Sequence, residues 1–313
     1  MKATEVRRAI LDDVANAFIG PEAITETLLI SLIAGGHVLL EGVPGVAKTT
    51  LAKRFSDCLG CTFNRIQFTQ DLLPTDVTGT HIFNMQSRQF EVQRGPVFAH
   101  IVLGDEINRA PPKAQSALLE AMQENQVTLD GTTFQLPTPF MVIATRNPIE
   151  QAGVYPLPEA QLDRFLICLE IGYPSEADEV HMLSTWRQTV TPPAVFLSPK
   201  QITELQTEAA AVHAAPAILQ YIVKLVSATR DDPRVALGAS PRAALGLLQA
   251  SRAHALLCGR SFIIPDDVKH LACDVLSHRL LLTNESVFNG LGNRQIVEDI
   301  ATQVECVGPV DEM

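Results

Sequence analysis

The chain has 313 residues, which at roughly 150 residues per domain predicts about two domains. Lysine and arginine number 24 against 35 acidic residues, and the net charge of −11 disfavours a general nucleic-acid binder, because such proteins rely on cations placed on phosphates. No stretch reaches the roughly 18 apolar residues of a membrane span, and the first residues lack the apolar core of a signal peptide.

Short apolar strands alternate with helical patterns over the first half of the chain. Apolar spacing predicts helices between residues 5 and 34, broken at Ile19-Gly20-Pro21, and another helix from Lys48 to about Leu59. Because strands separated by helices usually pair in parallel, this alternation predicts an α/β fold with a parallel sheet covered on both faces. The predicted strands cover residues 37–40, 63–68, 101–103, 140–144 and 165–169.

Two insertions interrupt the alternation. The Asp130-Gly131 turn predicts a hairpin over residues 127–135, just after a helix predicted over Pro112–Glu124 with proline in its first turn. Residues 79–95 form a second predicted hairpin or loop insertion.

The second half of the chain has a helical pattern. Ser175 can cap a helix through Trp186, and Thr191-Pro192-Pro193 is typical of a linker. About four further helices are predicted, followed by a weakly patterned segment from about Thr283; the helices open at Ser198-Pro199, Ala215-Pro216, Ser240-Pro241 and Pro265. The predicted domains are an α/β domain over 1–183, a linker over 184–195 and a small all-α domain over 196–313.

Six cysteines are scattered along the chain, and Cys58 and Cys61 form a single C-x-x-C pair. A zinc site needs four ligands, and no second pair of cysteines or histidines follows at zinc spacing. We therefore expect cysteines that pack between helices, rather than a redox or metal site, in the reducing environment of the cytoplasm.

The strongest motif is Gly42-Val43-Pro44-Gly45-Val46-Ala47-Lys48-Thr49, between a predicted strand and a predicted helix. In a phosphate-binding loop of this kind, consecutive backbone N–H groups and a helix N-terminus surround the phosphates. Lys48 can reach the β- and γ-phosphates of ATP, and the hydroxyl of Thr49 can bind Mg²⁺. Ala47 stands where glycine is usual, so we expect its φ to be negative. The alternative is a chance glycine-rich turn before a helix.

Polar residues also follow two of the predicted strands. Asp105 and Glu106 end the strand at 101–103, and the carboxyl edge of a parallel sheet is where α/β proteins bind ligands. Asp105 would hold Mg²⁺ through water, and Glu106 would act as the general base on the attacking water. Asn147 follows the strand at 140–144 and could position that water or sense the γ-phosphate. The alternatives are a solvated strand end for the two acids and an Asn-Pro turn for Asn147.

Together these residues resemble the AAA+ ATPases and, within them, the MoxR family, over roughly residues 15 to 175. The resemblance implies an αβα sandwich followed by a small helical lid. It rests on six blocks that occur in order: residues 35–49 (GGHVLLEGVPGVAKT), 71–74 (DLLP), 95–98 (GPVF), 105–112 (DEINRAPP), 117–122 (ALLEAM) and 155–165 (YPLPEAQLDRF).

The resemblance also assigns roles that the spacing alone leaves open. Asn147 would be sensor 1, Arg164 the arginine finger that enters a neighbouring subunit's site, and Arg242 sensor 2 on the lid. Without the family, Arg164 would be interpreted as an internal partner of Asp163, and Arg242 as a solvated arginine at a helix start. The implied nucleotide contacts are Ile19, Gly20, Gly42, Pro44, Gly45, Val46, Ala47, Lys48, Thr49 and Thr50.

The function implied by the resemblance is that of a chaperone-like ATPase. Such a protein would use Mg²⁺ and ATP to remodel or mature partner complexes, often with metal insertion, and its partners would carry a von Willebrand factor A domain. It would work as a hexameric ring, with hairpins near a central pore; a plain edge hairpin is the alternative. Two further functions stay open, a nucleic-acid-dependent motor and a slow nucleotide-dependent binding switch.

Overall fold

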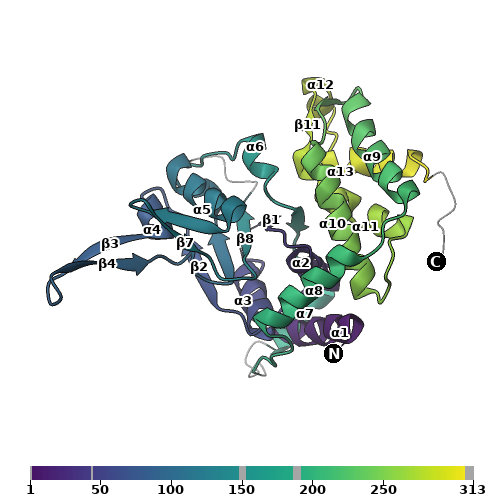
Figure 1. The fold of residues 1–313 in the computed structure, drawn as a ribbon. Helices are drawn as coiled ribbons and strands as arrows, with labels where there is room; N and C mark the ends of the chain where they lie inside the picture. The colour runs from purple at the N-terminus through teal and green to yellow at the C-terminus, as the bar shows by residue number, and fades with distance from the viewer. Residues whose placement is uncertain (1, 44, 148–152, 186–191, 307–313) are drawn as a thin grey trace.

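The computed structural model describes residues 2–43, 45–147, 153–185 and 192–306 (Figure 1). Its main sheet has five parallel strands in the order β2-β5-β8-β1-β9, which confirms the predicted parallel sheet. The strand bounds are Phe63–Gln67 for β2, Ile101–Asp105 for β5, Met141–Arg146 for β8, Val38–Gly42 for β1 and Ile167–Ile171 for β9.

Helices cover both faces of this sheet. Side chains on a strand alternate between faces, and in β5 Ile101 and Leu103 belong to one hydrophobic cluster while Val102 belongs to the other. All five residues of β5 are buried, as expected for a central strand of a covered parallel sheet. The helices of this domain are α1 (Ala3–Ala15), α2 (Glu22–Ile33), α3 (Lys48–Cys58), α4 (Pro74–Thr78), α5 (Pro112–Glu124) and α6 (Glu159–Leu162).

Both predicted insertions are antiparallel hairpins. Strands β3 (Gly79–Asn84) and β4 (Gln89–Arg94) form a long one that projects from the body of the domain, and β6 (Gln126–Leu129) and β7 (Thr132–Gln135) form a shorter one beside it (Figure 1). The hairpins are joined where His81 Nδ1 lies 2.7 Å from a carboxylate oxygen of Asp130.

The second domain is a helical lid. Before the lid, α7 covers Glu176–Thr185; the predicted end of this helix at Trp186 and Thr191 of the predicted linker lie outside the described residues. Ser198 and Ser240 cap α8 and α10 as predicted, each accepting a hydrogen bond from a backbone N–H of the first turn. The remaining elements are α8 (Pro199–Ala211), α9 (Pro216–Asp231), β10 (Val235–Leu237), α10 (Pro241–Leu257), α11 (Pro265–Leu276), β11 (Leu281–Leu282), α12 (Asn284–Phe288) and α13 (Asn293–Gln303).

The C-terminal part of the lid is more regular than the sequence pattern indicated. The segment after Thr283 forms α12 and α13, because Thr283 caps the first of these helices and Ile296, Val297 and Ile300 bury the inner face of the second. Two small β elements depart from an all-α lid within residues 192–306: the antiparallel pair β10 with β11, and a single bridge between His213 and Phe262. A single hydrophobic cluster runs from α1 and α2 into α8, α9, α10 and α11, so the lid packs directly on the α/β domain.

Of the cysteines predicted to pack between helices, Cys58 and Cys273 are buried and Cys258 is exposed. All six are free, and burial raises the pKa of Cys58 to about 12 and of Cys61 to about 11, so both remain thiols. Among the described residues there is no cluster of His, Cys, Asp and Glu that could hold a metal. Along the same residues, none of the helices has both the length and the apolar character that crossing a bilayer demands.

Candidate active site

The phosphate-binding loop connects β1 to α3 at the carboxyl edge of the sheet. Gly42 has to be glycine, since a Cβ there would lie 2.3 Å from the carbonyl oxygen of Ile171 on β9. Gly45 adopts a φ of 88°, which glycine reaches without strain. Pro44 lies outside the described residues. The unpaired N–H groups at the start of α3 face this loop and form the kind of N-terminus that binds phosphate.

One expectation about this loop is wrong. Ala47 has φ 55° and ψ 28°, which is left-handed backbone, instead of the negative φ expected for a residue with a Cβ. Ala47 is the N-cap of α3, and the left-handed turn is how the chain changes direction from the loop into the helix. Such a conformation costs about 1–2 kcal/mol for a residue other than glycine, and strain of this kind tends to occur at functional sites.

Lys48 opens α3 and turns back over the loop. Its Nζ donates a 2.8 Å hydrogen bond to the carbonyl oxygen of Gly42. Burial lowers the pKa of Lys48, and the negative charges of Asp105 and Glu106 oppose that shift, so this ammonium lies within electrostatic range of both acids. Thr49 follows in the first turn of the helix and is half-buried, while Thr50 is exposed.

Asp105 ends β5 and is held from two neighbouring strands. Its Oδ1 accepts a 2.6 Å hydrogen bond from the hydroxyl of Thr145 on β8. Its Oδ2 accepts from Nη2 and Nε of Arg65 on β2, at 2.7 and 3.1 Å. A carboxylate has about four acceptor positions, so one position on Oδ1 remains for a water molecule. Together with the hydroxyl of Thr49, this is an oxygen set of the kind that Mg²⁺ prefers.

Glu106 adopts left-handed backbone with φ 57°. Its N–H donates to the Thr145 hydroxyl at 2.8 Å, so one threonine orients both acids. The Glu106 carboxylate accepts a 3.1 Å hydrogen bond from the Gln67 amide and lies 3.1 Å from Nη1 of Arg109. The side chain remains partly open to solvent, with 26% exposed, which a residue that activates water requires.

Sequence reasoning missed the partners of the two acids: Arg65, Gln67, Arg109 and Thr145. Arg65 and Gln67 are two residues apart on β2, so they face the same side of the strand. That spacing was visible in the sequence, but the pairing of β2 with β5 was not. Thr145 directly follows an apolar run, as Asp105 does, and this position at the sheet edge was the available signal.

The remaining predicted contacts lie directly after β8, in the turn between α1 and α2, and on the lid. Asn147 directly follows β8 and is half-buried, as are Ile19 and Gly20 in the turn between α1 and α2. Arg242 lies in the first turn of α10 and is exposed; its charge contributes to lowering the pKa of His37, after the larger effect of burial. Their roles toward a nucleotide stay predictions.

Arg164 does not pair with its neighbour Asp163. Asp163 is instead bound to the lid, with its Oδ1 2.9 Å from Nε of Arg279. The Arg164 side chain lines a polar cavity of about 550 Å³ together with Glu120 and Glu124 of α5, and within the described residues it has no hydrogen bond or ion pair. The structure therefore separates Arg164 from the Lys48 loop of its own chain.

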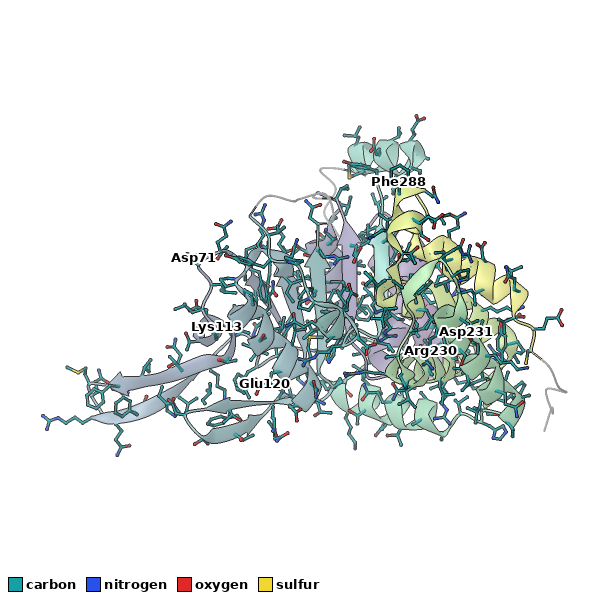
Figure 2. All side chains as sticks on the ribbon, turned by 90° about the horizontal axis from the view of Figure 1, so that it is seen from above. Asp71, Lys113, Glu120, Arg230, Asp231 and Phe288 are labelled. Atoms are coloured by element: carbon teal, nitrogen blue, oxygen red, sulfur yellow. The ribbon has the colours of Figure 1, made fainter. Side chains whose placement is uncertain are left out.

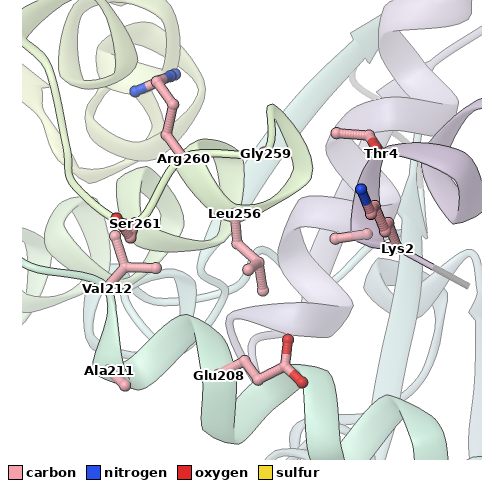
Figure 3. Close-up of a pocket in the computed structure, with 10 residues that line it drawn as sticks. Lys2, Thr4, Glu208, Ala211, Val212, Leu256, Gly259, Arg260 and Ser261 are labelled. Carbon is pink, nitrogen blue, oxygen red and sulfur yellow. The ribbon is translucent and has the colours of Figure 1, made fainter.

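Not every cavity belongs to this site. The cavity in Figure 3, of about 530 Å³, lies between the start of α1, the end of α8 and the end of α10. None of the predicted site residues lines it, and Lys2, Glu208 and Arg260 are its charged lining residues.

Comparison with known proteins agrees with this geometry. The family described as "ATPase family associated with various cellular activities (AAA)" matches residues 37–167, and the AAA lid domain matches residues 227–300. The chain is 47% identical to the protein YeaC of Bacillus subtilis, covering 94% of this chain and 93% of that protein. It is 46% identical to Chaperone MoxR1 of Mycobacterium tuberculosis, covering 96% and 81%. The crystal structure of a "putative ATPase" from Cytophaga hutchinsonii, 39% identical, matches with a TM-score of 0.90 and covers 98% and 97% of the two chains.

Proposed function

The chain belongs to the MoxR family of AAA+ ATPases, and from this premise we propose that it hydrolyses ATP with Mg²⁺ and uses the energy to remodel partner proteins. The observation that carries the proposal is the convergence of Lys48, Asp105 and Glu106 at one edge of the sheet, with Thr145 binding both acids.

The chemistry follows from what each residue can do. The loop amides and Lys48 would bind the β- and γ-phosphates, and Thr49 and Asp105 would hold Mg²⁺. The metal supplies neutralisation of the charge that develops on the phosphates. Glu106 would accept a proton from the attacking water, while Gln67 and Arg109 fix the direction of its carboxylate.

Two variants test this assignment. Glu106→Gln should bind ATP normally and lose about 10²- to 10⁴-fold in hydrolysis rate, because it removes the base and leaves the loop intact. Lys48→Ala should lose ATP affinity, measured with a fluorescent nucleotide. Wild-type turnover in Glu106→Gln would place the base elsewhere, and unchanged ATP binding in Lys48→Ala would refute the loop assignment.

The proposed assembly is a ring, most simply a hexamer, in which Arg164 of one subunit enters the site of the next. An arginine supplied by a neighbour stabilises transition-state charge and makes turnover depend on assembly. Within the described residues the Arg164 side chain makes no hydrogen bond or ion pair, which supports this role. The rate per subunit should therefore rise with protein concentration. A stable monomer with a concentration-independent rate would refute the ring.

The proposed client is a protein in the cytoplasm, carrying a von Willebrand factor A domain and matured with a metal. Support for a protein client comes from the net charge of −11 and from the β3–β4 hairpin, which extends away from the body with its side chains uncovered (Figure 2). Phe83 and Phe90 pack edge to face at 5.3 Å and are 49% and 70% exposed, and Met85 is 81% exposed. Exposed apolar side chains beside a hairpin turn are suited to contact another protein.

Capture with Glu106→Gln as an ATP-locked trap would identify the client, with Lys48→Ala as the nucleotide-free control. A protein retained by the first variant and absent from the second would support remodelling. Strong, salt-sensitive stimulation of hydrolysis by DNA would instead support a nucleic-acid motor. Full ATP binding with negligible turnover in assembled wild-type protein would support a binding switch.

A further inference from the structure

The residues on either side of Arg164 are bound by the lid of the same chain. Asp163 accepts hydrogen bonds from the Ser240 hydroxyl at 3.0 and 3.2 Å and lies 2.9 Å from Nε of Arg279. The carbonyl oxygen of Phe165 accepts from Nη2 of Arg279 at 2.7 Å and from Nε2 of His278 at 3.1 Å. The short segment that carries Arg164 is therefore held at both of its neighbouring residues.

On the lid, the residue that makes most of these bonds, Arg279, is itself buried and fixed in place. The side chain of Arg279 is 3% exposed, and its Nη1 also donates to the carbonyl oxygen of Val275 at 2.7 Å. A buried guanidinium that loses its carboxylate is left as an unpaired charge, so separation of Arg279 from Asp163 is costly. Asp163, Ser240 and Arg279 also border a cavity of about 650 Å³. Side-chain packing around them is therefore incomplete, and the polar contacts are what connect Asp163 to the lid.

Ser240 connects the same carboxylate to the start of α10. It is the N-cap of α10, and its hydroxyl accepts from the N–H of Ala243 while it donates to Asp163. Arg242, the predicted sensor of the γ-phosphate, lies two residues further on in the first turn. A shift of α10 would therefore pull on Asp163, whose next residue is Arg164.

We propose that Asp163 is a positioning residue that transmits the state of each subunit's lid to the arginine which that subunit offers to its neighbour. This inference rests on the proposed function, since it needs Arg164 to act in the next subunit's site. A misplacement of about 1 Å at a catalytic group can cost about 100-fold in rate, so a small lid movement is enough to switch the neighbouring site.

A mixed assembly tests the transmission. Subunits with Arg164→Ala keep their own site and lose their arginine, and subunits with Glu106→Gln keep their arginine and lose their base. Neither should hydrolyse ATP alone, and the mixture should, because Glu106→Gln subunits donate the arginine to Arg164→Ala subunits. An inactive mixture, beside active wild type, would refute the trans arginine in the proposed function and remove the premise of the inference.

Asp163→Asn is then added to one kind of subunit at a time. In the donor it should lower kcat of the mixture about tenfold and leave KM for ATP within about twofold, since the acceptor's own nucleotide contacts are intact. In the acceptor, which has no Arg164 to position, it should change kcat by less than about twofold. Equal losses in both places, or no loss in the donor, would overturn the inference.

Ser240→Ala serves where Asp163→Asn fails to fold, because it removes the bond to Asp163 and leaves the ion pair in place. Its matched control is Ser198→Ala, which removes the same kind of serine cap from α8, a helix that also opens with proline. In the donor, Ser240→Ala should lower kcat at least about threefold and Ser198→Ala should not. If the two substitutions have equal effects, Ser240 acts only as a helix cap, and the inference is overturned.

Discussion

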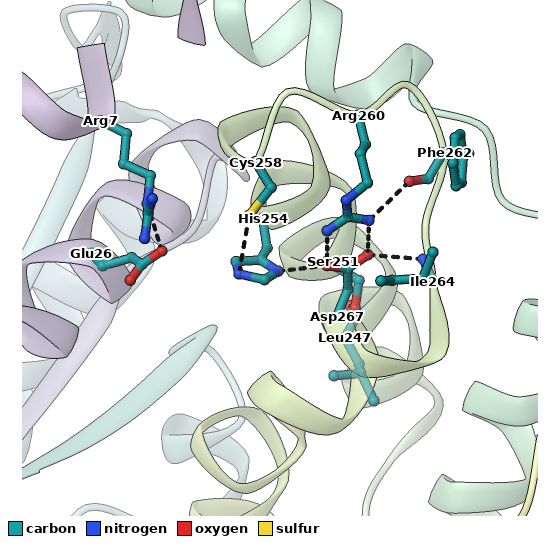
Figure 4. A network of polar contacts seen from close by, with 10 residues as sticks. All are labelled: Arg7, Glu26, Leu247, Ser251, His254, Cys258, Arg260, Phe262, Ile264 and Asp267. Carbon is teal, nitrogen blue, oxygen red and sulfur yellow. Dashed lines mark hydrogen bonds and ion pairs between the residues drawn. The ribbon is translucent and has the colours of Figure 1, made fainter. Parts of the chain in front are cut away.

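Asp105 at the sheet edge and Asp267 in the lid each bind an arginine, in very different surroundings. Asp105 pairs with Arg65, whose side chain is 47% exposed. Asp267 on α11 is 1% exposed and pairs with Arg260 through both carboxylate oxygens, at 2.5 and 2.6 Å, and with His254 at 2.7 Å (Figure 4). The N–H of Ile264 completes its set of donors at 2.8 Å.

The two sites differ in burial and in their donors. The carboxylate of Asp105 can exchange its arginine for another cation, whereas the carboxylate of Asp267 keeps its partners. Burial raises the pKa of Asp267, but hydrogen bonds from Arg260, His254 and the Ile264 N–H outweigh burial and bring it to about 2. Its donors lie within 13 residues along the chain, whereas those of Asp105 come from strands 40 residues away on either side. Within the described residues, backbone strain follows the same division: the non-glycine residues with positive φ are all in the α/β domain, at Ala47, Arg88, Glu106, Asn125 and Asp130.

The largest expected effect on stability is at Asp267. Asp267→Asn should lower the free energy of unfolding by about 3–5 kcal/mol, because it leaves Arg260 as an uncompensated charge. Asp105→Asn should cost no more than about 1 kcal/mol, since water can solvate the half-exposed Arg65, yet should reduce ATP hydrolysis strongly. Urea denaturation followed by circular dichroism measures both. Similar losses of unfolding free energy in the two variants would mean that Asp105 and Asp267 stabilise the fold equally.

The second effect is a dependence of stability on pH that arises beneath the active site. His37 precedes β1 and is buried; its Nδ1 accepts from the N–H of Val142 and its Nε2 donates to the Met122 carbonyl oxygen, both at 3.0 Å. Burial, reinforced by the charge of Arg242, lowers the pKa of His37 to about 4. The neutral ring is therefore part of the fold, and protonation would remove the acceptor that Val142 uses.

Because the pKa of His37 is lower in the folded than in the unfolded protein, acid destabilises the fold. The contribution of His37 is complete above the unfolded-state pKa of 6.5 and is lost as pH falls from 6.5 toward 4, by about 2 kcal/mol at pH 5. Unfolding free energies from pH 7 to pH 4.5 should fall more steeply for the wild type than for His37→Gln, which cannot titrate. Parallel curves would contradict the assignment.

The sequence predicted the parts of the fold that repeat simple local rules. All five strands of the main sheet, the helix Pro112–Glu124, the Asp130-Gly131 hairpin and the serine caps of α8 and α10 follow from apolar periodicity and turn chemistry. After Thr283, α12 was missed because it has only five residues, and α13 was missed because its apolar face becomes evident only against α11 and α9.

The sequence predicted the acids and the phosphate-binding loop of the candidate site. It did not predict the residues that hydrogen-bond to the acids. Lys48, Asp105 and Glu106 belong to a motif with a fixed order along the chain. Arg65 and Thr145 act through strand pairing over about 40 residues, which a single sequence does not contain. The backbone of Ala47 was mispredicted for a related reason, since the geometry of the loop overrides the preference of the residue.

Ala47 offers a third test, of whether the strain belongs to the site. Ala47→Gly should raise the free energy of unfolding by up to about 1 kcal/mol, because relief of about 1–2 kcal/mol at φ 55° exceeds the added chain entropy. Ala210→Gly, at an exposed position inside α8, should lower stability by about 1 kcal/mol and serves as the control. If both substitutions destabilise the protein alike, the left-handed backbone at Ala47 is not strained.

The smallest expected effect concerns Arg65 and sharpens the distinction between the two aspartates. Arg65 occupies Oδ2 of Asp105 at 2.7 Å while half-exposed, so it competes with a cation for the carboxylate without being essential to the fold. Arg65→Ala should change stability by less than about 1 kcal/mol and lower the Mg²⁺ concentration that half-saturates ATP binding about threefold. Arg88→Ala, which removes the same charge from the exposed hairpin turn, controls for general electrostatics. If Arg65→Ala instead raises the Mg²⁺ requirement, Arg65 orients Asp105 for the metal. The pair of Arg65 and Asp105 would then have a fixed geometry, like the buried pair of Arg260 and Asp267 in the lid.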